Sequence, residues 1–174
     1  MSSIEQLQYP IGKFSPKPSY TAQERASFID SIERLPSDIE NLIKSFSEKH
    51  WSTPYREGGW TALQVVHHLA DSHMNAYIRI KWTLTEETPV IKAYDEKLWA
   101  LTPEVSFDPL FSLALLKALH AKWALLLRNI PEDQLHRAFV HPDTGKKNSI
   151  ERMLALYSWH GEHHLGHLKI VANL

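Results

Sequence analysis

Four segments of the chain repeat apolar residues at the three- and four-residue spacing of an amphipathic helix. They cover approximately residues 21–46, 61–84, 109–130 and 149–174. The first two open with capping boxes, in which a threonine is followed three residues later by Glu24 or Gln64. No strand-like alternation and no internal repeat stands out between them. The pattern predicts an all-α protein in which four helices surround one core.

Prolines and glycines mark the irregular parts of the chain. Residues 9–18 contain three prolines and a glycine without helical periodicity, which predicts an extended N-terminal arm. Pro36 stands inside the first helical segment and is expected to kink or split it. Residues 86–108 are expected to form a long connection of the kind that often shapes a site, and residues 131–148 are expected to form a second irregular stretch.

Composition narrows the class of protein. The length of 174 residues predicts a single domain, residues 1–174, that can fold on its own core. Cysteine is absent, so any metal must be held by nitrogen or oxygen. The net charge of -1 gives no basic field for nucleic acid, and the sequence contains neither a signal-peptide pattern nor about 18 consecutive apolar residues. We therefore expect a cytoplasmic protein without a nucleic-acid or membrane partner.

Histidines are concentrated in the second and fourth helical segments. His160 and His164 form an H-x-x-x-H pair, which places two imidazoles one turn apart on one helix face. His167 shares their core-facing stripe, whereas His163 is expected to point elsewhere. Two imidazoles buried together need a shared partner to offset their desolvation, and imidazole suits a borderline metal ion. The spacing differs from H-E-x-x-H, so the general base of a zincin protease is absent from its usual place.

The second helical segment gives a weaker signal. His73 falls on its apolar face and, like His120, is expected to be a hydrogen-bonded packing residue. His68 shares a polar stripe with Asp71 and Arg79, which by spacing alone predicts a solvated face.

Six motifs, in the same order and over nearly the whole chain, resemble the YfiT group of metal-dependent hydrolases within the DinB-like superfamily. They are residues 9–12, 53–61, 65–75, 84–89, 94–97 and 159–167. The resemblance implies a four-helix bundle, a homodimer, a cytoplasmic location and one divalent metal ion per subunit. Matching the motifs residue by residue assigns the metal ligands to His68, His160 and His164. It therefore places His68 at an internal site, against the expectation from spacing.

The implied ligand set defines the candidate chemistry. Three neutral imidazoles leave a coordination position open, and zinc is the expected ion with nickel as the alternative. Asp71, three residues after His68, is the candidate for orienting a ligand or acting as acid or base. Gln64, Asn75 and Arg79 are candidates for the pocket wall.

We expect a metal-dependent hydrolase that uses a metal-bound water on a small-molecule substrate. One alternative is a metal-dependent S-transferase for a thiol such as bacillithiol, mycothiol or glutathione, in which the cosubstrate supplies the sulfur. The other alternative is a non-catalytic interaction module stabilised by the metal. The ligand set serves hydrolysis and thiol transfer equally well, whereas the interaction module predicts a coordinately saturated ion and no turnover.

Overall fold

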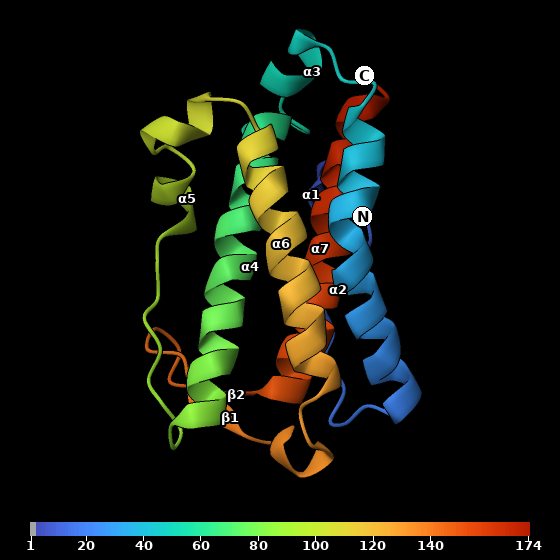
Figure 1. Ribbon diagram of the computed structural model, residues 1–174. Coiled ribbons are helices and arrows are strands. Elements are labelled where there is room, and N and C mark those ends of the chain that lie inside the picture. Colours follow the sequence, from blue (N-terminus) through green and yellow to red (C-terminus); the bar gives the residue numbers. More distant parts are fainter. Residues whose placement is uncertain (1–2) are drawn as a thin grey trace.

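Four long helices pack into a bundle in the computed structural model, which describes residues 3–174 (Figure 1). They are α2 (Ala22–Ile43), α4 (Ala62–Thr85), α6 (Leu110–Arg128) and α7 (Ile150–Ala172). The predicted all-α four-helix bundle is confirmed.

The order of the helices around the bundle differs from their order along the chain. α2 contacts α6 and α7, and α4 contacts the same two helices, so the consecutive helices α2 and α4 lie across the diagonal. Figure 1 shows α2 and α7 running in one direction and α4 and α6 in the other. Because α4 and α6 are parallel neighbours, the chain must return along the length of the bundle between them. Residues 86–109 make this return, which accounts for the long connection.

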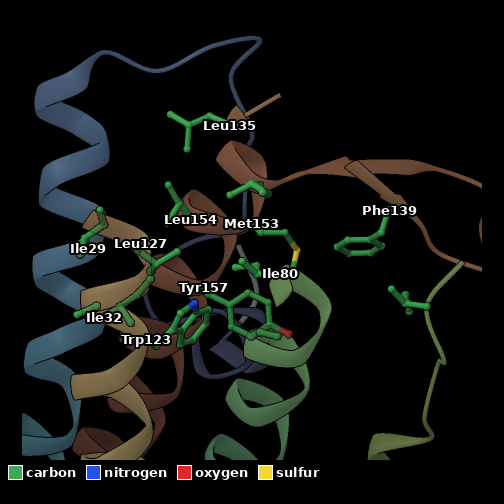
Figure 2. Packing of buried hydrophobic residues seen from close by; sticks show 14 residues of the cluster. Ile29, Ile32, Ile80, Trp123, Leu127, Leu135, Phe139, Met153, Leu154 and Tyr157 are labelled. Atoms are coloured by element: carbon green, nitrogen blue, oxygen red, sulfur yellow. The ribbon is translucent and has the colours of Figure 1, made fainter. Parts of the chain in front are cut away.

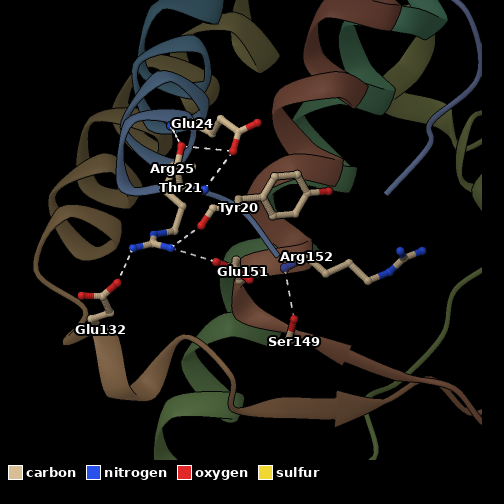
Figure 3. Close-up of polar contacts among 8 residues, drawn as sticks. All are labelled: Tyr20, Thr21, Glu24, Arg25, Glu132, Ser149, Glu151 and Arg152. Carbon is tan, nitrogen blue, oxygen red and sulfur yellow. Dashed lines mark hydrogen bonds and ion pairs between the residues drawn. The ribbon is translucent and has the colours of Figure 1, made fainter. Parts of the chain in front are cut away.

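The hydrogen bonds at the helix starts agree with the capping residues in the sequence. Both predicted capping boxes form, at Thr21 and at Thr61. Ser149 caps α7 by accepting from the backbone N–H of Arg152 (Figure 3). Arg25 in the first turn of α2 donates to Glu132 and Glu151 and so ties the start of α2 to the start of α7 (Figure 3).

Pro36 does not split the first long helix. α2 is helical from Ala22 to Ile43, and Pro36 is buried in the same apolar face as Leu35 and Ile39. Packing of this face compensates for the hydrogen bond that proline cannot donate. The helix ends at Ile43, three residues before the predicted end at Phe46.

The connections contain short elements that periodicity did not predict. A two-stranded antiparallel hairpin interrupts residues 131–148, so this stretch is less irregular than expected. Each of its strands has three residues, too few to show alternation in the sequence. The short elements are α1 (Ser3–Gln8), α3 (Glu48–Ser52), α5 (Glu96–Trp99), η1 (Pro103–Ser106), η2 (Glu132–Gln134), β1 (Ala138–Val140) and β2 (Lys147–Ser149).

The predicted extended arm is confirmed and packs along α7. The indole N–H of Trp159 donates to the carbonyl oxygen of Gly12 at 3.2 Å. The rings of Phe14 and Trp159 lie 5.8 Å apart between centroids. Gly166 brings the helix so near the arm that an added Cβ would lie 2.8 Å from the Pro10 ring. The arm thus covers a face of α7 that the bundle leaves open.

Two apolar clusters fill the bundle. Figure 2 shows the first, in which the buried Trp123 and Tyr157 lie beside isoleucines and leucines of α2 and α6. Phe139 of the hairpin also packs into this cluster, so the hairpin closes that end of the bundle (Figure 2). The second cluster surrounds Leu69, Leu116 and Leu168. Along α4, α6 and α7, buried histidines lie between the two clusters.

Helix α6 is apolar enough to resemble a membrane span. Within residues 3–174 it alone is long and apolar enough to cross a membrane by length and composition. This is weak evidence for a span, because the core helix of a bundle passes the same test. Leu113, Leu116 and Trp123 of α6 are buried against the other helices. The absence of a membrane partner stays a prediction.

Candidate metal centre

Three histidines from two adjacent helices converge between the apolar clusters. One ring nitrogen from each of His68, His160 and His164 lies within 4.8 Å of the others. The Nε2 atoms of His68 on α4 and His160 on α7 are 3.3 Å apart. Because metal ligands must share one small volume, this group could hold a single ion.

Burial keeps these imidazoles neutral. It lowers the pKa of His68 to about 4, with a further contribution from His163. Burial also lowers the pKa values of His160 and His164 well below the ordinary value. Neutral rings retain the lone pairs that a metal ion requires.

A chain of imidazoles fixes the proton on His160. Its Nδ1 lies 3.1 Å from Nε2 of His73, and Nδ1 of His73 lies 2.9 Å from Nε2 of His120. Nδ1 of His120 reaches the backbone carbonyl oxygen of Ile32. Because a carbonyl oxygen only accepts, each neutral ring in turn must carry its proton on Nδ1. Nε2 of His160 is left with a free lone pair directed toward His68.

A second chain of hydrogen bonds fixes the proton on His164. Nε2 of His167 lies 3.3 Å from the carbonyl oxygen of Gln8, so it carries the proton and leaves Nδ1 of this ring as an acceptor. Nδ1 of His164 lies 3.3 Å from that acceptor and must donate to it. Nε2 of His164 is therefore left without a proton. Two rings with free Nε2 lone pairs beside a third imidazole fit a metal ion held by nitrogen.

His73 and His120 are the hydrogen-bonded packing residues that the sequence predicted. Both are fully buried, and neither belongs to a candidate ligand group. The structure also separates the neighbours His67 and His68. Nδ1 of His67 lies 2.8 Å from the Ser112 hydroxyl of α6, so this ring faces away from His160.

His163 is buried although it lies off the core-facing stripe of α7. It packs between Tyr9 of the arm and Trp159, because the arm covers this face of α7. His163, His164 and His167 form a second group whose nitrogens lie within 4.8 Å of one another. Within residues 3–174, Nδ1 of His163 has no hydrogen-bond partner. The two groups share His164.

The polar stripe of α4 is not a solvated face. His68 and Arg79 are only 7% and 8% exposed, because the Trp60 ring packs against His68 and the return connection contacts Arg79 at Lys92. A cavity of about 410 Å³ opens beside the three histidines. Its other lining residues are Trp60, Ser72, Arg79, Tyr94, Glu96, His141 and Asp143. The spacing of residues along α4 could not reveal this site, because connections distant in the sequence form its outer wall.

Asp71 lies outside the lining of that cavity. Burial raises the pKa of its carboxyl to about 6, and the nearby Glu104 adds to this shift. Its predicted role as acid, base or orienting group stays a prediction. Of the other wall candidates, Gln64 lines an adjoining cavity of about 710 Å³ together with His164. Asn75 lines neither cavity.

The bundle and its histidine groups define a helical protein whose buried imidazoles could hold a metal ion. The family model described as the DinB superfamily matches residues 31–168, and the chain belongs to this superfamily. It is 46% identical over 169 residues to "Putative metal-dependent hydrolase YfiT" of Bacillus subtilis, covering 97% of this chain and 94% of that protein. A Bacillus licheniformis protein, also described as a "Putative metal-dependent hydrolase", is 45% identical over 167 residues, which cover 95% of each chain.

A solved structure gives the same result for the fold. It is described as "YfiT from Bacillus subtilis is a probable metal-dependent hydrolase with an unusual four-helix bundle topology". The match has a TM-score of 0.94 and 44% sequence identity, and it covers 97% of both chains.

The buried histidines make metal-free protein less stable in mild acid. Unfolded histidine takes up a proton near pH 6.5, whereas His68 and His120 in the folded protein do so only near pH 4. Their folded pKa values are depressed, so their stabilisation is present above about pH 6.5 and is lost as the pH falls toward the folded values. Urea unfolding with a chelator should therefore show a falling free energy of unfolding from about pH 7.5 to 5.

Two variants check the source of this loss. His163→Phe should reduce the loss of unfolding free energy between about pH 7.5 and 5, because burial also lowers the pKa of His163 to about 4. Asp71→Asn should increase this loss of unfolding free energy, because the carboxyl with its raised pKa takes up a proton in the folded protein and so stabilises the fold as the pH falls. A free energy of unfolding that stays constant over this range in the wild type would contradict the prediction.

Proposed function

We propose that this protein is a metal-dependent hydrolase acting on a small-molecule substrate, with one divalent ion held by His68, His160 and His164. The observation that carries the proposal is the pair of free Nε2 lone pairs, on His160 and His164, beside His68 at the wall of a cavity. The descriptions of the relatives as metal-dependent hydrolases support it.

The donor set favours zinc, with nickel as the alternative. All three donors are neutral imidazoles, which suit both ions, and the group contains no carboxylate of the kind preferred by magnesium or calcium. When bound by three protein ligands, such an ion supplies a Lewis acid and lowers the pKa of a coordinated water toward 7.

The side chains around the ligands hold them and shape the cavity. His73 and His120 fix the orientation and proton of His160, and His167 does so for His164. The centroids of the Trp60 and His68 rings lie 4.5 Å apart, so Trp60 shields this side of the ligands from solvent. The cavity volume of about 410 Å³ suits a small molecule.

We also propose a single domain and a cytoplasmic homodimer without a nucleic-acid partner. The resemblance to the YfiT group and the net charge of -1 support this. Size-exclusion chromatography with light scattering measures the oligomeric state directly.

Replacing a ligand should abolish stoichiometric metal binding. We expect His68→Ala and His160→Ala each to leave less than about a tenth of the wild-type zinc after dialysis, because two imidazoles form an incomplete site. Elemental analysis measures the bound metal. His163→Ala is the matched control, because it removes a histidine found only in the second group. Retention of metal by His68→Ala together with its loss from His163→Ala would place the ion in the second group.

Breaking the imidazole chain should weaken metal binding without removing a ligand. His120→Leu leaves His73 without its acceptor, and His160 then loses its orienting partner, so we expect zinc affinity to fall about 10- to 100-fold. His120→Gln can donate and accept and should restore part of the affinity. Competition with a chromogenic chelator measures both variants, and the exposed His136→Gln is the control. Unchanged affinity in a folded His120→Leu protein would refute the orienting role.

Turnover distinguishes the proposed hydrolase from its alternatives. The zinc-loaded protein should cleave a member of a broad ester and amide panel with water alone, and a hydroxamate should inhibit it. An S-transferase requires an added thiol, whose binding shifts the visible spectrum of cobalt-substituted protein. Thiol-dependent turnover without hydrolysis of any panel member would overturn the hydrolase proposal in favour of transfer. Metal binding without turnover in either assay would favour an interaction module.

A further inference from the structure

Arg79 occupies an unusual position in the cavity beside the three histidines. It lies on α4, eleven residues after His68, which places the two residues on nearly the same helix face and about 16 Å apart along the axis. Side chains on a helix lean toward its N-terminus, so the guanidinium extends back toward His68. Both residues line the cavity of about 410 Å³. Arg79 is only 8% exposed.

The contacts of Arg79 leave much of its hydrogen-bonding capacity unused. One Nη donates to the carbonyl oxygen of Lys92 at 3.2 Å, and the guanidinium lies 5.8 Å from the centroid of the Tyr94 ring. The Tyr157 hydroxyl also lies beside it. The Nε–H is buried and has no hydrogen-bond partner in residues 3–174. A guanidinium has five N–H donors, so several remain available to a ligand.

The charge of Arg79 is also unpaired. Among residues 3–174, no carboxylate oxygen lies within 4.0 Å of its guanidinium nitrogens. The similarly buried guanidinium of Arg25 contacts both Glu132 and Glu151. The two acidic residues of the cavity, Glu96 and Asp143, are exposed and screened by water. Burying an arginine without a counter-ion is costly, which indicates that a bound anion completes the pair.

We propose that Arg79 binds the carboxylate of the substrate, so that this site acts on small carboxylate-bearing molecules whose reacting group lies at the three histidines. This inference rests on the proposed function of the site. A guanidinium suits a carboxylate because it donates two parallel hydrogen bonds in one plane. The rings of Trp60 and Tyr94 supply apolar walls for the body of the molecule.

The same chemistry fits two sources of carboxylate. It belongs either to the molecule that is hydrolysed or to a carboxylate-bearing thiol cosubstrate. Two sets of probes separate these sources. The first is a series of hydroxamates of increasing chain length that end in a carboxylate, compared with equal-length hydroxamates that end in a carboxamide. The second compares mercaptocarboxylates with their amides.

Calorimetry on zinc-loaded protein measures the affinity of each probe. In the wild type, we expect the best carboxylate probe to bind about 10- to 100-fold more tightly than its amide. Arg79→Gln should abolish this preference while leaving the amide affinity and the bound zinc unchanged. Arg79→Lys should keep part of the preference, because it retains the charge. Lys81→Gln, which removes an exposed cation from the same helix, should keep all of it.

The outcomes separate the role of Arg79 from that of the metal. If Arg79 only anchors the connection at Lys92, Arg79→Gln will weaken carboxylate and amide probes equally, and the proposal is wrong. A wild type without any carboxylate preference overturns it as well. Failure of every hydroxamate and thiol to bind overturns the metal site instead. In that case, hexanoate compared with hexanamide still decides whether Arg79 binds a carboxylate. A preference confined to one probe set identifies the source.

Discussion

The backbone carbonyl oxygen of Ile32 determines much of the chemistry of this protein. It can only accept a hydrogen bond, so it places a proton on Nδ1 of His120 and, through His73, on Nδ1 of His160. The carbonyl oxygen of Gln8 acts in the same way on His164 through His167. These chains also explain how so many imidazoles can be buried between two apolar clusters, because an unpaired polar group there would cost about 1–3 kcal/mol.

The imidazole chains connect the ligands to the scaffold. Ile32 belongs to α2 and His120 to α6, whereas the candidate ligands belong to α4 and α7, so all four long helices contribute to the position of one ring. Gln8 belongs to α1, whose contact with α7 brings the N-terminal region into the same arrangement. The geometry of the candidate centre therefore depends on the packing of the whole bundle rather than on a local motif.

The sequence predicted the features that one helix determines by itself. Apolar periodicity located the long helices, and Thr21 and Thr61 marked two of their starts. The H-x-x-x-H spacing placed His160 and His164 on one face. The surroundings of His68 and Arg79 were beyond such reasoning, because they come from other segments: Trp60 and α7 pack against His68, and the return connection contacts Arg79. The resemblance to a known family, rather than spacing, indicated that His68 is internal.

The parallel arrangement of α4 and α6 has a consequence for how this fold can diversify. A chain that leaves one helix and enters its parallel neighbour must travel back along the bundle, and here residues 86–109 do so on the outside of α4. This segment carries Tyr94 and Glu96 of the cavity wall but contributes few residues to the apolar clusters. Changes in the length or composition of this segment can therefore alter the cavity beside the histidines while the four helices keep their packing. The part of the cavity wall that this segment forms can thus vary without changing most of the packing that stabilises the bundle.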